Sequence, residues 1–321
     1  MEKGNLKKGL IFGICGTVLG GFNPIIANSR PEIIDAYLFA AMTVIVQALV
    51  FFPLMLVERN KLKSDYNNEI ITINEMDSFL NGYKKNIPVL IFVGISFGFC
   101  FILFFEGYKA AGAINGNLAL KTTIFFSLVF DWLLLREKIS IKQVIFSIIL
   151  FFGLFLAVTQ GSFNIFELNS GVLILLSVAG IWMFAHALTK PMLDRHEISS
   201  IQLVCVRNTI SSIFLFSTYF LFYPLENVNI LLNPISLFWG ILMGGVYGVG
   251  LYLWYKCLEN INVSKATIIV SGNLLFTVIF AMLLLGEVFT IFHLMGAILV
   301  IISIIVIVNQ KKEEDKEIEI I

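Results

Sequence analysis

Three ionisable side chains lie inside long apolar stretches of this 321-residue sequence. Lys121, His186 and Arg207 each fall within a segment that otherwise resembles a membrane-spanning helix. A charge near the middle of a bilayer costs about 3 kcal/mol even on the lenient insertion scales, so such residues need a partner or a function. A fixed cation can hold an anionic group, and a histidine can exchange protons near neutral pH.

Lys121 is the strongest of these candidates. Asn117 lies one helical turn before it, so the two side chains share a face that is polar and suited to line a cavity. The functional interpretation is a fixed cation that holds a carboxylate or phosphate of a substrate. The alternative is a lysine that pairs with a neighbouring acid or extends its long stem toward the outer interface.

Arg207 and His186 have more ordinary alternatives. Arg207 lies closer to the predicted inner surface, where the favoured interpretation is a structural ion pair, with Asp194 or Glu197 as the partner, or an arginine that extends to the interface. His186 could couple proton movement to function. A neutral histidine that is hydrogen-bonded between helices is the commoner case.

The composition of the chain assigns it to the membrane class. Hydrophobic residues make up 58% of the sequence, charged residues 14%, and the mean hydropathy is +0.89. A helix needs roughly 20 apolar residues to cross a bilayer. By this measure we predict spans at 8–27, 34–57, 87–108, 113–135, 140–160, 169–190, 199–223, 234–258, 265–285 and 289–309.

The second half of the chain repeats the first at a shift of 150 residues. Without gaps, 91–141 and 241–291 are identical at 11 of 51 positions, including two glycines and a Leu-Leu-Leu-x-Glu run. Five spans per half is an odd number, so the second repeat must enter the membrane from the opposite side. The predicted fold is an all-α membrane protein with ten transmembrane helices as two inverted five-helix repeats, 8–160 and 169–309, followed by a charged tail, 310–321.

Lysine and arginine predict the orientation. If the N-terminus is cytoplasmic, only Arg30 and Lys109 lie outside, and all other loop cations lie inside. We therefore expect a multi-pass protein of the cell membrane with both termini in the cytoplasm. The longest cytoplasmic loop, 58–86, contains Thr72-x-x-Glu75, a capping-box pattern that predicts a short amphipathic helix on the membrane interface.

Enzyme chemistry is not expected. Gly94-x-Ser96-x-Gly98 matches a nucleophile pattern, but that pattern works on a strand-to-helix turn, and here it falls inside an apolar helix. The cysteines are scattered and fit buried thiols, with no metal-binding spacing. The formal net charge is zero. We expect no cofactor, metal or nucleic acid; the partners are the lipid bilayer and a small-molecule substrate, and the protein is a monomer or a homodimer.

Several short segments resemble the EamA-type branch of the drug/metabolite transporter superfamily. Leu133–Glu137 and Leu283–Glu287 are similar to the helix end "llxGE" of that family, and Gly20–Asn23 resembles its "WGxNF" stretch. The repeat partner of Lys121 is Ser271. This asymmetric charge is similar to the phosphate- and acid-recognising members and implies an anionic or zwitterionic substrate.

The resemblance implies a central cavity lined by spans 1, 3, 4, 6, 8 and 9, with spans 5 and 10 at the periphery. It implies a secondary carrier that moves a small polar or anionic metabolite, such as an amino acid or organic acid, by alternating access. The alternative is a non-transporting membrane sensor or scaffold that uses the 58–86 loop and the tail. Glu137 and Glu287 are expected to be structural helix-end anchors. The candidate substrate-binding residues on this template are Asn23, Asn117, Lys121, Trp182, His186, Tyr247, Tyr252, Ser271 and Asn273.

Overall fold

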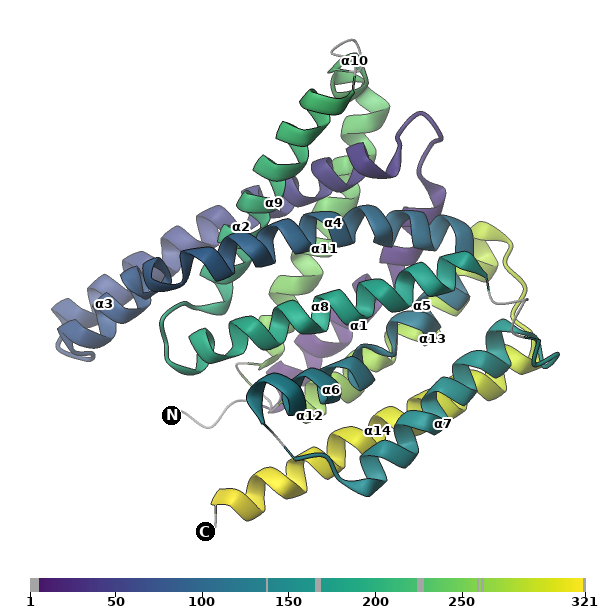
Figure 1. Cartoon of the computed structure of the whole chain (residues 1–321). Helices are drawn as coiled ribbons and strands as arrows, with labels where there is room; N and C mark the ends of the chain where they lie inside the picture. Colours follow the sequence, from purple (N-terminus) through teal and green to yellow (C-terminus); the bar gives the residue numbers. More distant parts are fainter. Residues whose placement is uncertain are drawn as a thin grey trace. The chain divides into compact units, whose positions relative to one another are not determined.

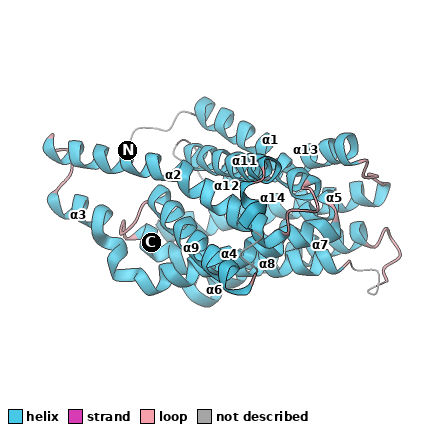
Figure 2. Ribbon diagram, turned by 90° about the horizontal axis from the view of Figure 1, so that it is seen from above, coloured by secondary structure: helices cyan, strands magenta, loops and turns pink. Residues whose placement is uncertain are grey.

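The computed structural model describes residues 6–136, 138–164, 169–223, 228–258, 260 and 263–319, and these contain helices and no strands (Figures 1 and 2). Ten helical segments are long and apolar enough to cross a membrane, which confirms the predicted count and the all-α membrane class. The elements are α1 (Leu6–Ser29), α2 (Ala36–Asn67), α3 (Ile73–Asn81), η1 (Gly82–Asn86), α4 (Ile87–Ala111), α5 (Ala113–Leu120), α6 (Thr123–Leu135), α7 (Ile141–Val158), α8 (Ser170–Asp194), α9 (Ser200–Phe222), α10 (Val228–Leu232), α11 (Pro234–Leu258), α12 (Val263–Ser271), α13 (Asn273–Phe280), η4 (Ala281–Leu285) and α14 (Ile291–Glu319).

The chain forms two compact units that differ from its sequence halves. Unit 1 contains 1–30, 103–183 and 249–321, and unit 2 contains 31–102 and 184–248. Each unit therefore combines segments of both repeats. Three of the four divisions fall inside α4, α8 and α11, and the fourth falls between α1 and α2.

Unit 1 contains the pair α7 and α14, which lie side by side (Figure 1). Gly153 permits the close approach, because a Cβ there would lie 2.9 Å from the Gly296 carbonyl oxygen. Gln160, beyond the end of α7, contacts His293 near the start of α14 at 3.1 Å. The two helices therefore run in opposite senses.

Unit 2 contains the pair α2 and α9. Tyr37 near the start of α2 bonds Thr218 near the end of α9, and Glu58 further along α2 bonds Ser199 at the start of α9. These helices also run in opposite senses. α2 and α9 are the second spans of their repeats, and α7 and α14 are the fifth. Equivalent helices that run oppositely are what inverted insertion of two copies would produce.

The repeated glycines pack helices closely in unit 2. A Cβ on Gly94 of α4 would lie 2.5 Å from Ile210 of α9, and a Cβ on Gly244 of α11 would lie 2.5 Å from Val46 of α2. Gly94 and Gly244 are equivalent in the two repeats. Each therefore sits against the second helix of the opposite repeat, as expected for small residues at helix contacts in membranes.

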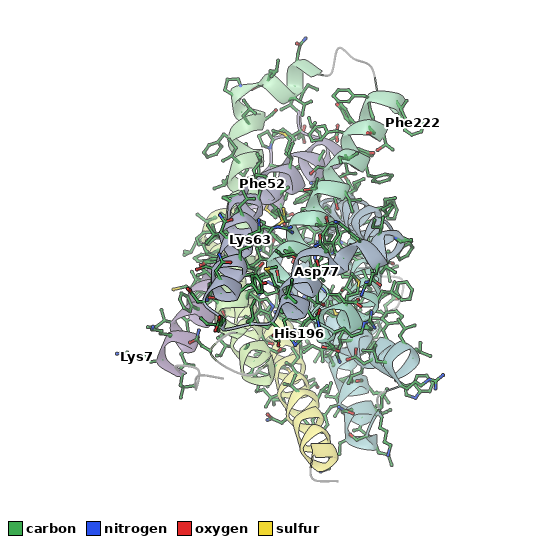
Figure 3. All side chains as sticks on the ribbon, turned by 90° about the vertical axis from the view of Figure 1, so that its left-hand side faces the viewer. Lys7, Phe52, Lys63, Asp77, His196 and Phe222 are labelled. Carbon is green, nitrogen blue, oxygen red and sulfur yellow. The ribbon has the colours of Figure 1, made fainter. Side chains whose placement is uncertain are left out.

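Apolar side chains on the outer faces of the helices match a lipid environment. Phe52 on α2 and Phe222 at the end of α9 are exposed, whereas Lys63 lies on the polar extension of α2 (Figure 3). Three of the four cysteines are buried, as expected, but Cys15 on α1 is exposed. Cys15 needs no polar partner there, because a thiol behaves as a small apolar group.

The predicted short helix of the 58–86 loop is α3. Thr72 and Glu75 form the reciprocal capping box. Leu80 on α3 is buried, whereas Ile73 is exposed. At the following turn, a Cβ on Gly82 would lie 2.7 Å from the backbone of Glu197. α3 and η1 therefore pack against the segment that joins α8 to α9.

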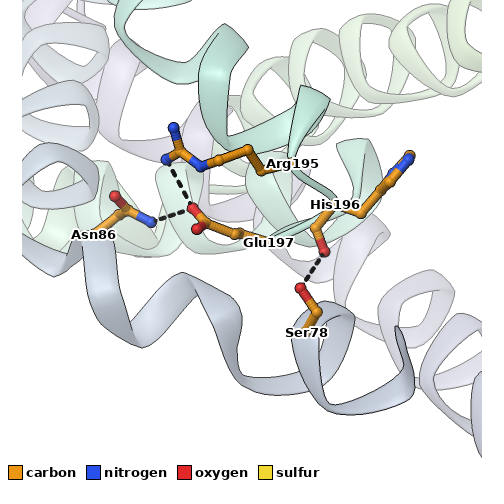
Figure 4. A network of polar contacts seen from close by, with 5 residues as sticks. All are labelled: Ser78, Asn86, Arg195, His196 and Glu197. Carbon is orange, nitrogen blue, oxygen red and sulfur yellow. Dashed lines mark hydrogen bonds and ion pairs between the residues drawn. The ribbon is translucent and has the colours of Figure 1, made fainter. Parts of the chain in front are cut away.

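Polar contacts reinforce this packing (Figure 4). Ser78 donates a hydrogen bond to the carbonyl of His196 at 3.1 Å. The Glu197 carboxylate accepts hydrogen bonds from Arg195 at 2.9 Å and from Asn86 at 2.7 Å. These two bonds hold the pKa of Glu197 below its ordinary value.

Candidate functional site

The fourth and ninth spans are both interrupted at equivalent positions in unit 1. The amides of Lys121 and Thr122 donate to carbonyls three residues earlier, each at 3.1 Å, so α5 ends and α6 begins there. Gly272, which is equivalent to Thr122, donates to Ile269 at 3.0 Å between α12 and α13. A tightened turn inside a long helix often marks a functional hinge or a strained sequence.

The two interruptions face each other through a polar contact. The Lys121 ammonium donates a hydrogen bond to the side-chain oxygen of Asn273, which is the first residue of α13. A Cβ on Gly20 of α1 would lie 3.3 Å from the side-chain nitrogen of Asn273. α1 therefore approaches Asn273 closely at Gly20.

A second polar contact lies one turn away. Asn117 of α5 donates to the hydroxyl of Thr277 of α13 at 2.6 Å, and that hydroxyl donates to the Gly21 carbonyl of α1 at 3.2 Å. Asn117 is 3% exposed and Thr277 is fully buried. Since 117 pairs with 277 and 121 pairs with 273, the equivalent spans 4 and 9 also run in opposite senses.

α1 is also bonded to the second interruption. The Thr17 hydroxyl lies 3.1 Å from the carbonyl of Ile269, three residues before Gly272, and 2.7 Å from the carbonyl of Gly13 on its own helix. Ser271 turns its hydroxyl back to the carbonyl of Thr267 at 2.8 Å, and the residue is 7% exposed. Ser271 therefore lies next to the site, but its hydroxyl serves its own helix.

The charge of Lys121 lacks an acidic partner within the described part of the chain. Asn273 is neutral, and no carboxylate forms an ion pair with Lys121 among those residues. The expected alternative, a lysine paired with a neighbouring acid, is therefore not observed there. A half-buried ammonium with only an amide partner favours an anionic ligand, which would supply the missing charge.

Asn23 lies one turn beyond Gly20 on α1. Its side-chain oxygen is buried and accepts no hydrogen bond from the described residues. A buried acceptor without a donor costs about 1–3 kcal/mol, which a ligand or water at that position would offset.

Two predicted aromatic residues of unit 1 have packing partners. Trp182 is 9% exposed, and its ring lies 5.6 Å from that of Phe104. Tyr252 on α11 lies under the ammonium of Lys256 at 5.7 Å. These contacts give both residues a packing role.

The two remaining candidates, His186 and Tyr247, belong to unit 2. The ring of His186 lies 5.4 Å from Phe97, and the guanidinium of Arg207 lies 3.9 Å above the same Phe97 ring. Tyr247 contacts Phe101 at 5.3 Å.

The expected partners of Arg207 are corrected in part. Glu197 is bonded to Arg195 and Asn86, not to Arg207. Arg207 instead lies on an aromatic face and donates to Asn208 at 3.4 Å. A guanidinium can be stabilised in this way because it is planar and weakly hydrated.

Sequence reasoning missed Thr17, Gly21 and Thr277. Threonine is a weak signal in an apolar helix, because its hydroxyl usually bonds its own backbone. The signal that could have identified Thr277 is its place one turn after Asn273, opposite Asn117 when spans 4 and 9 are aligned in opposite senses. Glu287 is described below, and Glu137 lies outside the described residues.

Comparison with known proteins places this arrangement in a family. A model of the EamA-like transporter family matches residues 7–159 and 169–309, which is most of the chain and both halves. The chain belongs to the EamA-like transporter family. It is a multi-pass membrane protein of a transporter family, with ten candidate spans among its described residues.

Individual relatives agree with this membership. The uncharacterized transporter YyaM of Bacillus subtilis is 27% identical over 231 residues, which cover 69% of this chain and 73% of that protein. An uncharacterized transporter of Methanothermobacter thermautotrophicus is 21% identical over 304 residues, covering 93% of this chain and 83% of that protein. One crystal structure has the same fold with a TM-score of 0.60 at 12% identity, covering 94% of this chain and 96% of that chain.

Proposed function

We propose that this protein is a secondary carrier that moves a small anionic or zwitterionic metabolite, such as an amino acid or organic acid, by alternating access. The observation that carries the proposal is the Lys121 ammonium, which lies at a helix interruption in the membrane with the neutral Asn273 as its hydrogen-bond partner. A carboxylate or phosphate of the substrate would complete this site with a charge-assisted hydrogen bond.

The interruptions themselves support a transport role. Transporters built from inverted repeats place their substrate near the midplane, between discontinuous helices. Here the two interruptions are equivalent in the repeats and meet through Lys121 and Asn273. The glycine contacts of α4 with α9 and of α11 with α2 would let helices shift against one another.

The energy source of transport and the orientation of the protein in the membrane are also part of the proposed function. The sequence has no P-loop pattern, so a gradient or substrate exchange would drive transport. The distribution of lysine and arginine supports a cell-membrane protein with both termini in the cytoplasm.

A binding screen tests the site. Purified full-length protein in detergent is heated with a panel of amino acids, organic acids and phosphate esters, and the unfolding temperature is recorded. A ligand at 100 times its Kd stabilises the folded state by about 2.7 kcal/mol, which is a readily measured shift.

The matched variants are Lys121→Ala and Lys109→Ala, since Lys109 is an exposed lysine at the end of α4. We expect anionic compounds to stabilise the parent and Lys109→Ala equally and to lose their effect on Lys121→Ala. An anion that stabilises Lys121→Ala as well as the parent would remove Lys121 from the site.

A further inference from the structure

Glu287 lies just after η4, at the end of the ninth span, and contacts the start of α5 in the other repeat. Its two carboxylate oxygens accept hydrogen bonds from the first two amides of α5, those of Ala113 at 2.6 Å and Ile114 at 3.0 Å. The amides at a helix start have no partner within the helix and carry partial positive charge, so a carboxylate is well matched to them.

The start of α5 is built to receive this carboxylate. Gly112 occupies the N-cap position and supplies no side-chain cap of its own. Its φ of +80° is favourable only for glycine, and a Cβ there would lie 3.1 Å from a Glu287 oxygen. Gly112 therefore leaves open the space that Glu287 uses.

α5 connects this contact to the candidate site. The helix has 8 residues, so it spans about 12 Å. It begins on Glu287, is bonded in its middle through Asn117 to Thr277, and is followed directly by Lys121, which bonds Asn273. A short rigid helix held at its start passes any displacement there on to the residue at its end.

A further contact steadies the same helix. The side-chain oxygen of Asn115 on α5 lies 3.1 Å from a ring nitrogen of His293 on α14. His293 in turn contacts the Thr290 hydroxyl at 3.1 Å. The first turn of α5 is therefore held by two residues that follow η4: Glu287, in the link to α14, and His293, in the first turn of α14.

We propose that Glu287 is a positioning residue for the anion site: it fixes α5 so that Lys121 meets Asn273 and the bound anion. This inference rests on the proposed function and goes beyond a helix-end anchor, because it gives Glu287 an effect on ligand affinity through α5.

The first test measures the position of α5 without any ligand. The pair Asn117→Cys and Thr277→Cys replaces short side chains already in contact, and its rate of disulfide formation under mild oxidant is followed by mass spectrometry. Adding Glu287→Gln should slow this reaction by roughly tenfold, because a disulfide forms only in a narrow geometry. Gly112→Ala, which crowds the same carboxylate, should act alike.

The matched control is Glu75→Gln, which removes a capping carboxylate from α3 in unit 2 and should leave the rate unchanged. Unaltered cross-linking in both Glu287→Gln and Gly112→Ala would overturn the positioning role. This outcome is independent of whether Lys121 binds an anion.

The second test measures binding of succinate and inorganic phosphate by titration calorimetry. It uses protein without the two introduced cysteines. Glu287→Gln should weaken the affinity for whichever anion binds the parent by roughly tenfold to a hundredfold, as small displacements in preorganised sites do. If Glu287→Gln binds the anion as tightly as the parent while Lys121→Ala loses binding, the positioning role of Glu287 is contradicted and the anion site at Lys121 is not. Affinity retained in Lys121→Ala would contradict the proposed function.

Discussion

At the residue scale, polar side chains of unit 1 form hydrogen bonds between the two repeats. The charge of Lys121 has no acidic partner among the described residues. Asn117, Thr277 and the Gly21 carbonyl form one closed set of hydrogen bonds. Lys121 and Asn273 form a second set, which lacks an anion. The first set is structural in character, and the second has the character of a binding site.

Replacing Thr277 with valine tests this division. The change keeps the volume but leaves the Asn117 amide without its acceptor, so we expect unfolding to become easier by about 1–3 kcal/mol. Thr209→Val is the control, since its hydroxyl contacts Cys205 one turn earlier on its own helix, through both the carbonyl and the thiol, and the residue is exposed. Thermal melts of both variants provide the measurement, and equal losses would contradict a special role for Thr277.

The sequence identified the important residue types at this scale but not their pairing. Lys121 and Asn273 were both predicted as site residues, because polarity in an apolar span is visible in sequence. Their hydrogen bond depends on spans 4 and 9 lying side by side in opposite senses, which no local pattern specifies. The contact of Arg207 with Phe97 was missed for the same reason, since residue 97 is one phenylalanine among 31.

At the element scale, the repeated glycines decide which helices can approach closely. Gly94 and Gly244 face opposing side chains at distances that a Cβ cannot occupy, whereas a Cβ on Gly98 or Gly248 would meet ordinary contacts at 3.4 and 3.6 Å. The sequence pattern predicted that these glycines pack helices. It could not separate the tight positions from the tolerant ones.

Alanine substitutions distinguish the tightly packed glycines from the tolerant ones. Gly94→Ala and Gly244→Ala should each destabilise the folded protein by about 1–3 kcal/mol through overpacking. Gly98→Ala and Gly248→Ala are the matched controls and should be close to neutral. Unfolding in a graded denaturant measures all four, and a loss at Gly98 equal to that at Gly94 would show that the contact distances do not govern stability.

The packing of α3 and η1 on 195–199 should depend on pH. The pKa of Glu197 is lowered by hydrogen bonds from Arg195 and Asn86, so its contribution is present above the ordinary carboxyl pKa of about 4.3 and is lost as the pH falls through the lower folded value. Amide exchange of residues 73–86 should therefore accelerate under strongly acidic conditions. Glu197→Gln should reduce this dependence without removing it, because hydrogen bonds from Thr72 also lower the pKa of Glu75, which caps α3. A dependence that is unchanged in the variant would contradict a contribution from Glu197.

The helix interruptions illustrate what sequence could not show at this scale. Span 4 reads as one apolar stretch from 113 to 135, yet α5 ends at Leu120 and α6 begins at Thr123. Gly272 is a weak cue in span 9, and Lys121-Thr122-Thr123 is not a helix-breaking sequence. The interruption arises where Thr122 and Thr123 bond carbonyls three residues earlier in the same turn.

At the scale of the whole molecule, a duplicated chain has formed two compact units that each draw on both repeats. The length of the spans, their number and the membrane class could be predicted, because they depend on composition and on the thickness of a bilayer. The division into units could not be predicted, because it depends on which spans of opposite repeats pack together. Pairing between equivalent helices makes the repeats interdependent, so neither half is expected to fold alone.

Transport in proteoliposomes tests the central claim most directly. Purified protein is reconstituted, loaded with the anion that stabilises it most in the binding screen, and assayed for exchange with the labelled anion outside. We predict that the parent and Lys109→Ala exchange the anion and that Lys121→Ala does not, with folding of each variant verified by its melting curve. Exchange by folded Lys121→Ala at the rate of the parent would contradict a carrier whose substrate anion is held by Lys121.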